Sequence, residues 1–168
     1  MTLGGRTTDA MPDAETIARI ILAARSDGFQ GFGGACGEAA VAINRVLFDG
    51  RAEIVGVFNE AFFDRGRLVG HVAVRIGDVY WDADASPKTL DDIEHWGSLD
   101  PHDLDYAEQA GEAGIGWDET AATEVVVVGF DSDLEVLEHF ESGLIPILTS
   151  ALEAAKAALP SPAGAAPR

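Results

Sequence analysis

The chain has 168 residues, a length that suits one domain with a buried core, and 47% of them are hydrophobic. Asp and Glu total 29 against 11 Lys and Arg, which gives a formal net charge of -18. A surface this acidic repels nucleic-acid phosphates and anionic lipid, so we expect neither nucleic acid nor membrane as a partner.

The cellular compartment is indicated by cysteine usage and hydropathy. The single cysteine, Cys36, excludes an internal disulfide and gives no sign of an oxidising environment. The first residues contain no apolar stretch, so we expect no signal peptide, and no apolar run approaches the length of a membrane span. These features predict a soluble protein of the cytoplasm.

Helix patterns open the chain after a flexible lead at 1–10. The segment 11–28 predicts a helix, with Asp13 suited to its start and a glycine to its end. A glycine-rich loop at 28–35 follows. A second helix is expected from Cys36 to about residue 48, with small and aliphatic side chains on its buried side.

Strand patterns fill the middle of the chain, at 52–58, 67–76, 79–84 and 123–130. The dipeptide Gly77-Asp78 separates the second and third as a two-residue hairpin turn. The stretch 85–122 is acidic and irregular, with a short helix expected at 89–96.

The C-terminal part predicts a helix that begins at Ser132 or Asp133, breaks and restarts at Pro146, and reaches about residue 159. Residues 160–168 predict a disordered tail. Residues 11–159 thus predict a single α+β domain, with N-terminal helices packed on a mostly antiparallel sheet and a helix at the C-terminal end.

Cys36 is the first candidate for chemistry. At the start of the second helix its thiol would lie at the positive end of the helix dipole, which favours the nucleophilic thiolate. The unpaired backbone N–H groups there could also stabilise an oxyanion. The plain alternative is that Cys36 is a small buried apolar residue.

A thiolate nucleophile needs a base, and His71 is the histidine on a predicted strand. A two-residue turn pairs Ile76 with Val79 and places His71 opposite Asp84, with Asp82 diagonal to it on the same face. Either carboxylate could orient the imidazole and stabilise its charged form. Both could equally belong to a solvated acidic face.

The order of cysteine at a helix start, histidine at a strand start and aspartate on the adjoining strand resembles the papain-like cysteine peptidases, and above all their transglutaminase-like branch. CGEAAVAINRVLF (36–48) is similar to the cysteine helix of that branch, and HVAVRIGDVYWDAD (71–84) to its histidine strand, turn and aspartate. The resemblance covers about residues 28–86, and it implies a papain-like or transglutaminase-like fold.

The resemblance also implies roles for individual residues. QGFGGAC (30–36) matches the peptidase pattern in which a glutamine hydrogen-bonds the oxyanion, and this gives that role to Gln30. No tryptophan follows Cys36, where those peptidases usually have one. The family places its acid soon after an aromatic residue, which favours Asp82, just after Trp81, whereas simple strand pairing favours Asp84.

Two classes of function follow. The first is a cysteine-dependent acyl-transfer enzyme with the triad Cys36, His71 and Asp82, acting on a protein or peptide amide as a peptidase, amidase, deamidase or transglutaminase. The second is a non-catalytic binding or regulatory domain that keeps the fold. We expect no cofactor, and no metal site, because the spacing of His95 and His102 matches no zinc motif. The sequence does not indicate an oligomeric state.

Overall fold

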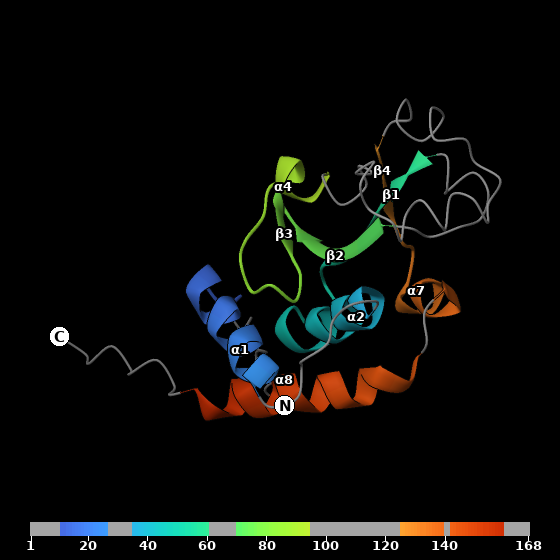
Figure 1. The fold of residues 1–168 in the computed structure, drawn as a ribbon. Helices are drawn as coiled ribbons and strands as arrows, with labels where there is room; N and C mark the ends of the chain where they lie inside the picture. Colours follow the sequence, from blue (N-terminus) through green and yellow to red (C-terminus); the bar gives the residue numbers. More distant parts are fainter. Residues whose placement is uncertain (1–10, 27–34, 61–69, 95–124, 140–141, 160–168) are drawn as a thin grey trace, which may run out of the picture.

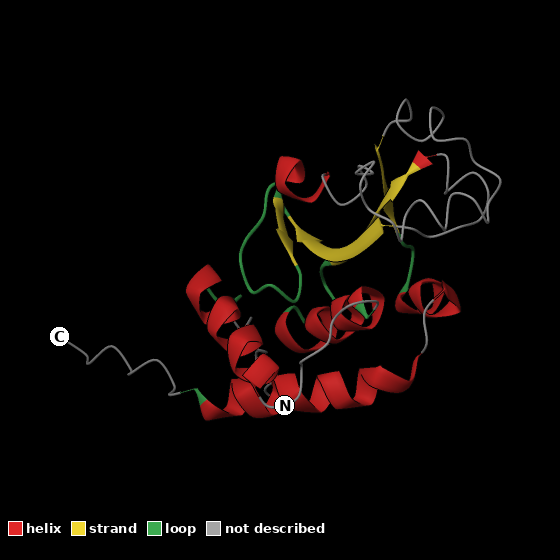
Figure 2. Cartoon of the chain, viewed as in Figure 1, coloured by secondary structure: helices red, strands yellow, loops and turns green. Residues whose placement is uncertain are grey.

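The computed structural model describes residues 11–26, 35–60, 70–94, 125–139 and 142–159. These residues form an α+β fold in which helices lie against a four-stranded antiparallel sheet (Figures 1 and 2). The predicted lead at 1–10, the tail at 160–168 and the glycine-rich loop up to residue 34 lie outside the described residues.

The elements follow the predicted order. The helices are α1 (Ala14–Ser26), α2 (Cys36–Leu47), α4 (Leu90–Glu94), α7 (Asp133–His139) and α8 (Ile145–Ala158), and a 3-10 turn, η1 (Ser142–Leu144), precedes α8. The strands are β1 (Glu53–Asn59), β2 (Gly70–Ile76), β3 (Val79–Trp81) and β4 (Val125–Gly129). Pro146 stands in the first turn of α8, so the C-terminal helix restarts where the sequence predicts. The missing N–H of the proline costs no helix hydrogen bond at this position.

The hairpin of β2 and β3 has the predicted register. Ile76 pairs with Val79, and Val74 pairs with Trp81. The prediction that the third strand continues to residue 84 is wrong, because β3 ends at Trp81. The direct pairing of His71 with Asp84 therefore does not form.

Side chains of β2 and β3 alternate between two apolar clusters, one on each face of the sheet. Val72, Val74 and Trp81 join the larger core with the helices. Ala73 and Tyr80 face the other way and pack with Ile93 of α4, which lies on the opposite side of the sheet from α1, α2 and α8 (Figure 1). Both faces are thus covered around the hairpin.

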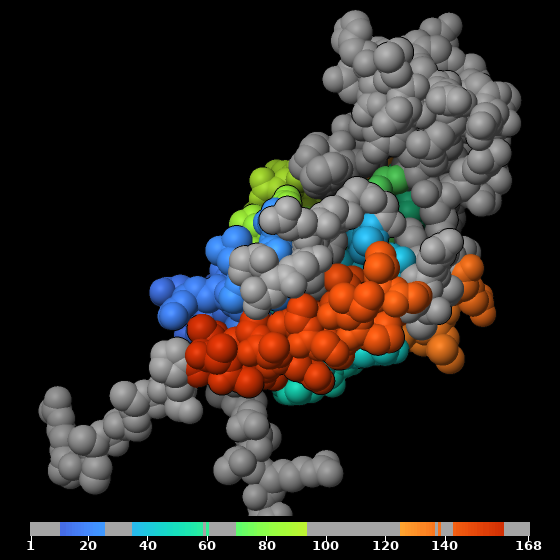
Figure 3. Space-filling view, turned by 60° about the horizontal axis from the view of Figure 1, so that its bottom comes forward, coloured from blue at the N-terminus to red at the C-terminus, as the bar shows by residue number. Residues whose placement is uncertain are grey.

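Helix α2 is the centre of the larger core. It contacts α8, β2, β1 and α7, and ten of its twelve residues are buried. Its alanines, Ala39, Ala40 and Ala42, let neighbouring elements approach closely, as expected for a helix that is apolar on most sides. Figure 3 shows α8 along the outer face of the helical layer, with α1 beside it. The helix that begins at Cys36 is therefore held from several directions.

Candidate active site

Cys36 is the first residue of α2, as the sequence predicts. It is a free cysteine of intermediate exposure. Ala35 stands at the N-cap and has no side-chain group to bond the first N–H groups of the helix. Because the helix dipole is most positive here, this end of the helix favours a developing negative charge on a bound molecule.

His71 lies near the start of β2 and is largely buried, with 15% of its side chain exposed. Its Nε2 donates a hydrogen bond to Oδ2 of Asp82 over 2.9 Å. The Cys36 thiol lies close enough to His71 to raise the pKa of the imidazole.

Asp82 directly follows β3, and only 4% of its side chain is exposed. Its Oδ2 accepts from His71, while its Oδ1 accepts from the ammonium of Lys88 at 2.6 Å and from the backbone N–H of Asp84 at 2.9 Å. The carboxylate is thus fully engaged, which is what a buried charge requires.

The pKa values of the pair move in opposite directions. Burial lowers the pKa of His71, but its hydrogen bonds to Asp82 and Cys36 outweigh this and raise that pKa from 6.5 to about 9. Burial raises the pKa of Asp82, but the hydrogen bonds from His71, Lys88 and the Asp84 N–H lower it from 3.8 to about 2. At neutral pH the geometry favours an imidazolium beside an ionised aspartate.

The structure therefore brings together three of the four predicted site residues, Cys36, His71 and Asp82. It also separates the two candidate acids: Asp82 bonds His71, whereas the Asp84 side chain is 59% exposed and contacts Lys88 at 3.5 Å. Gln30 lies outside the described residues.

Lys88 is a site residue that the sequence patterns did not single out. Its ammonium lies against the Asp82 carboxylate, and 11% of its side chain is exposed. A signal did exist, because this acidic chain has only two lysines and one of them follows Asp82 by six residues. Glu38 lies in the first turn of α2. It is 3% exposed, and its Oε2 has no hydrogen-bond partner in the described structure.

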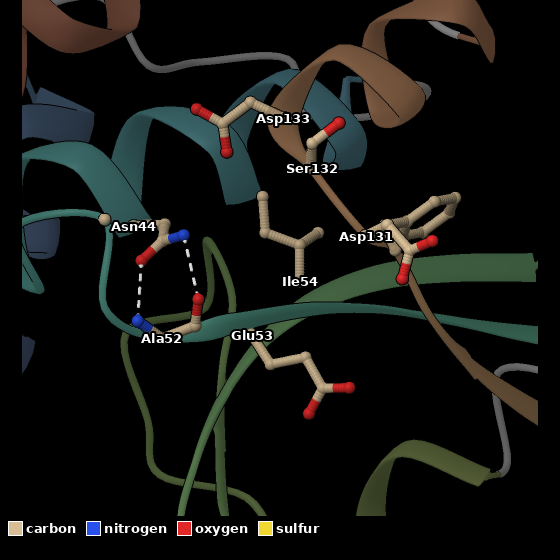
Figure 4. Close-up of a pocket in the computed structure, with 9 residues that line it drawn as sticks. Asn44, Ala52, Glu53, Ile54, Asp131, Ser132 and Asp133 are labelled. Atoms are coloured by element: carbon tan, nitrogen blue, oxygen red, sulfur yellow. Dashed lines mark hydrogen bonds between the residues drawn. The ribbon is translucent and has the colours of Figure 1, made fainter.

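A pocket of about 270 Å³ lies elsewhere, between the end of α2, the start of β1 and the segment from β4 to α7 (Figure 4). Asn44 lines it, eight residues and so about 12 Å along α2 from Cys36. The amide of Asn44 is already used, since it bonds both the N–H and the C=O of Ala52. The other polar side chains around the pocket are mainly acidic. The pocket is separate from the Cys36 site.

Among the described residues, no group of three or more His, Cys, Asp or Glu side chains could hold a metal ion. His95 and His102, whose spacing matches no zinc motif, lie outside the described part of the chain. No helix in the described segments is long and apolar enough to cross a membrane.

Comparison of the chain with protein-family models, with curated proteins and with solved structures found no match.

Proposed function

We propose that this protein is a cysteine-dependent acyl-transfer enzyme with a papain-like or transglutaminase-like fold. Cys36 is the nucleophile, His71 the acid and base, and Asp82 the group that orients His71. The observation that carries the proposal is the arrangement of three side chains. Cys36 is the first residue of α2, its thiol helps to raise the pKa of His71, and Nε2 of His71 lies 2.9 Å from Oδ2 of the buried Asp82. A residue that only filled space would need neither a helix N-terminus nor an imidazolium partner.

In the proposed reaction the Cys36 thiolate attacks the carbonyl carbon of an amide and forms a carbon–sulfur bond, and the carbonyl electrons move to the oxygen. The backbone N–H groups at the start of α2, with Gln30, stabilise this oxyanion. As the tetrahedral intermediate collapses, the His71 imidazolium gives its proton to the leaving nitrogen, and an amine departs from the acyl-enzyme.

The second half of the reaction reverses these roles. Neutral His71 takes a proton from an acceptor, which attacks the thioester, and the collapse of the second intermediate returns the thiolate and the imidazolium. Water as the acceptor gives a peptidase, amidase or deamidase, and an amine gives transamidation. The substrate class is an amide of a protein or peptide, and the cytoplasm is the proposed location.

The decisive test is the reactivity of the thiol below neutral pH. At pH 6 a free cysteine of pKa about 8.5 is only about 0.3% thiolate, so it alkylates slowly. The proposal predicts that iodoacetamide labels Cys36 at pH 6 about tenfold faster or more than it labels glutathione, even though a thiolate of lower basicity is a weaker nucleophile. Labelling is followed by intact mass spectrometry, with Cys36→Ser as the blank.

If Cys36 were labelled no faster than glutathione, and at the same rate in His71→Ala, the proposed enzymatic function would be wrong. The fold would then be that of a non-catalytic binding or regulatory domain.

A further inference from the structure

The loop after β3 folds back onto the strand that it leaves. Lys88 forms an antiparallel bridge with Tyr80, in which each residue's N–H donates to the other's carbonyl over 2.9 Å. Inside this loop the N–H of Asp84 bonds the Asp82 side chain, and Ala85 takes a positive φ of 61°. The bridge fixes the main chain of Lys88 beside the strand that ends at Asp82.

The side chain of Lys88 then turns into the loop instead of into solvent. Its Nζ lies 2.6 Å from Oδ1 of Asp82, 3.4 Å from Oγ of Ser86 and 3.5 Å from Oδ2 of Asp84. These oxygens all belong to the loop that Lys88 closes. A lysine with 11% side-chain exposure carries a desolvation cost, so such a complete set of acceptors indicates a specific role.

The two oxygens of Asp82 are divided between two cations. Lys88 and the Asp84 N–H hold Oδ1, which leaves Oδ2 directed at Nε2 of His71. Both cations lie against a carboxylate that is only 4% exposed, and a buried charge of this kind is stable only where it is paired and hydrogen-bonded.

We infer that Lys88 is a positioning residue of the Cys36 site: its ammonium fixes the Asp82 carboxylate so that one oxygen always faces His71. The inference concerns the Asp82–His71 contact directly, and its consequence for catalysis rests on the function proposed above. Lys88 contacts neither Cys36 nor a substrate in this proposal, and it acts only through Asp82.

The test compares Lys88→Met with Lys88→Arg and with Lys156→Met. Methionine keeps the aliphatic stem and removes the charge. Lys156 is the matched control, because its ammonium also makes a short hydrogen bond, to the Val46 carbonyl at 2.7 Å, at the far end of α2. NMR follows two signals: exchange of the His71 Nε2–H proton with water, and the carboxyl carbon of Asp82 during acid titration.

In Lys88→Met we expect the Nε2–H proton to exchange about tenfold faster or more, as for the loss of one charge-assisted hydrogen bond. The Asp82 carboxyl should titrate roughly one pH unit higher, because a cation that favours its ionised form is gone. Lys88→Arg should stay close to wild type in both signals, and so should Lys156→Met. A purely structural role for Lys88 would lower stability without moving either signal.

Wild-type exchange and an unchanged Asp82 midpoint in Lys88→Met would overturn the inference, as would equal losses in Lys88→Met and Lys88→Arg. If Lys88→Met does not fold, the same two measurements on Lys88→Gln decide. Neither signal depends on turnover. A wild-type Cys36 that labels slowly at pH 6 would therefore refute the enzyme, whereas the positioning of Asp82 by Lys88 is decided by the two NMR signals alone.

Discussion

His71 and Asp82 are eleven residues apart in the chain, yet Nε2 of one lies 2.9 Å from Oδ2 of the other. The hairpin makes this contact. The two-residue turn at Gly77 and Asp78 sets the register of the hairpin. Because β3 ends at Trp81, the backbone of Asp82 is free to turn away from the strand. The pair thus sits at the open end of the hairpin, where the imidazole also reaches Cys36 at the start of α2.

The first prediction concerns stability against pH. Folding lowers the pKa of Asp82 from 3.8 to about 2, so its contribution is complete above about pH 4 and is lost as the pH falls through 2. Folding raises the pKa of His71 from 6.5 to about 9, so its contribution is complete below pH 6.5 and is lost as the pH rises through 9. The shared ion pair should add about 2 kcal/mol to the free energy of unfolding between these limits.

Urea unfolding of wild type and Asp82→Asn from pH 3 to 10 measures this contribution as a difference. The difference should be largest between about pH 4 and 6.5 and should shrink on both sides. Taking the difference removes the general repulsion of the acidic chain, which both proteins share. A difference that stays constant across the whole range would contradict the ion pair.

The second prediction identifies the orienting acid. In wild type we expect Cys36 to alkylate rapidly at pH 6, and His71→Ala should slow it about tenfold or more, because the imidazolium that favours the thiolate is lost. Asp82→Asn should slow it substantially as well. Asp84→Asn is the matched control and should change little, since the Asp84 carboxylate is exposed and bonds no part of His71 in the described structure.

An Asp84→Asn variant slowed as much as Asp82→Asn would reverse this assignment. Combining either variant with His71→Ala completes the test, because only the true partner should lose its effect once the imidazole is gone.

The sequence predicted the hairpin register correctly because a two-residue turn leaves one pairing of the flanking strands. It also placed Cys36 correctly, since a glycine-rich loop followed by a run of small residues predicts a helix start at that point. Both signals are local. The need of a thiolate for a base, and the resemblance to the transglutaminase-like branch, then joined Cys36 and His71 in one predicted site.

The choice between Asp82 and Asp84 needed information that strand alternation does not carry. The alternating pattern continues to residue 84, but the Asp82 side chain accepts the Asp84 N–H, and this turn ends the strand early. Lys88 could not be placed either, because its role depends on the return of the loop to Tyr80. Gln30 stays a prediction.

The third prediction concerns salt. With 29 acidic residues against 11 basic ones, like-charge repulsion opposes the compact fold. Added potassium chloride screens this repulsion, so the melting temperature should rise between low and molar salt. The exposed pair Arg45–Asp133 weakens under the same conditions, but such pairs contribute less than about 1 kcal/mol each. Calorimetry at several salt concentrations checks the sign, and a steadily falling melting temperature would contradict the argument.

The fourth prediction links the backbone before His71 to the site. Gly70 pairs with Phe58 at the start of β2, and a Cβ there would overlap the backbone carbonyl oxygen of Val57. Because main chain cannot move aside as a flexible side chain does, Gly70→Ala should destabilise the fold by about 2 kcal/mol or more. It should also slow Cys36 alkylation at pH 6 towards the rate of His71→Ala, since the next residue along the strand is His71.

Gly143→Ala is the control, because a Cβ there meets no atom within 4 Å, and both its stability and its labelling should match wild type. If Gly70→Ala kept wild-type stability and labelling, β2 would not need a glycine to present His71, and the strand start would have to adjust more freely than its pairing with β1 suggests.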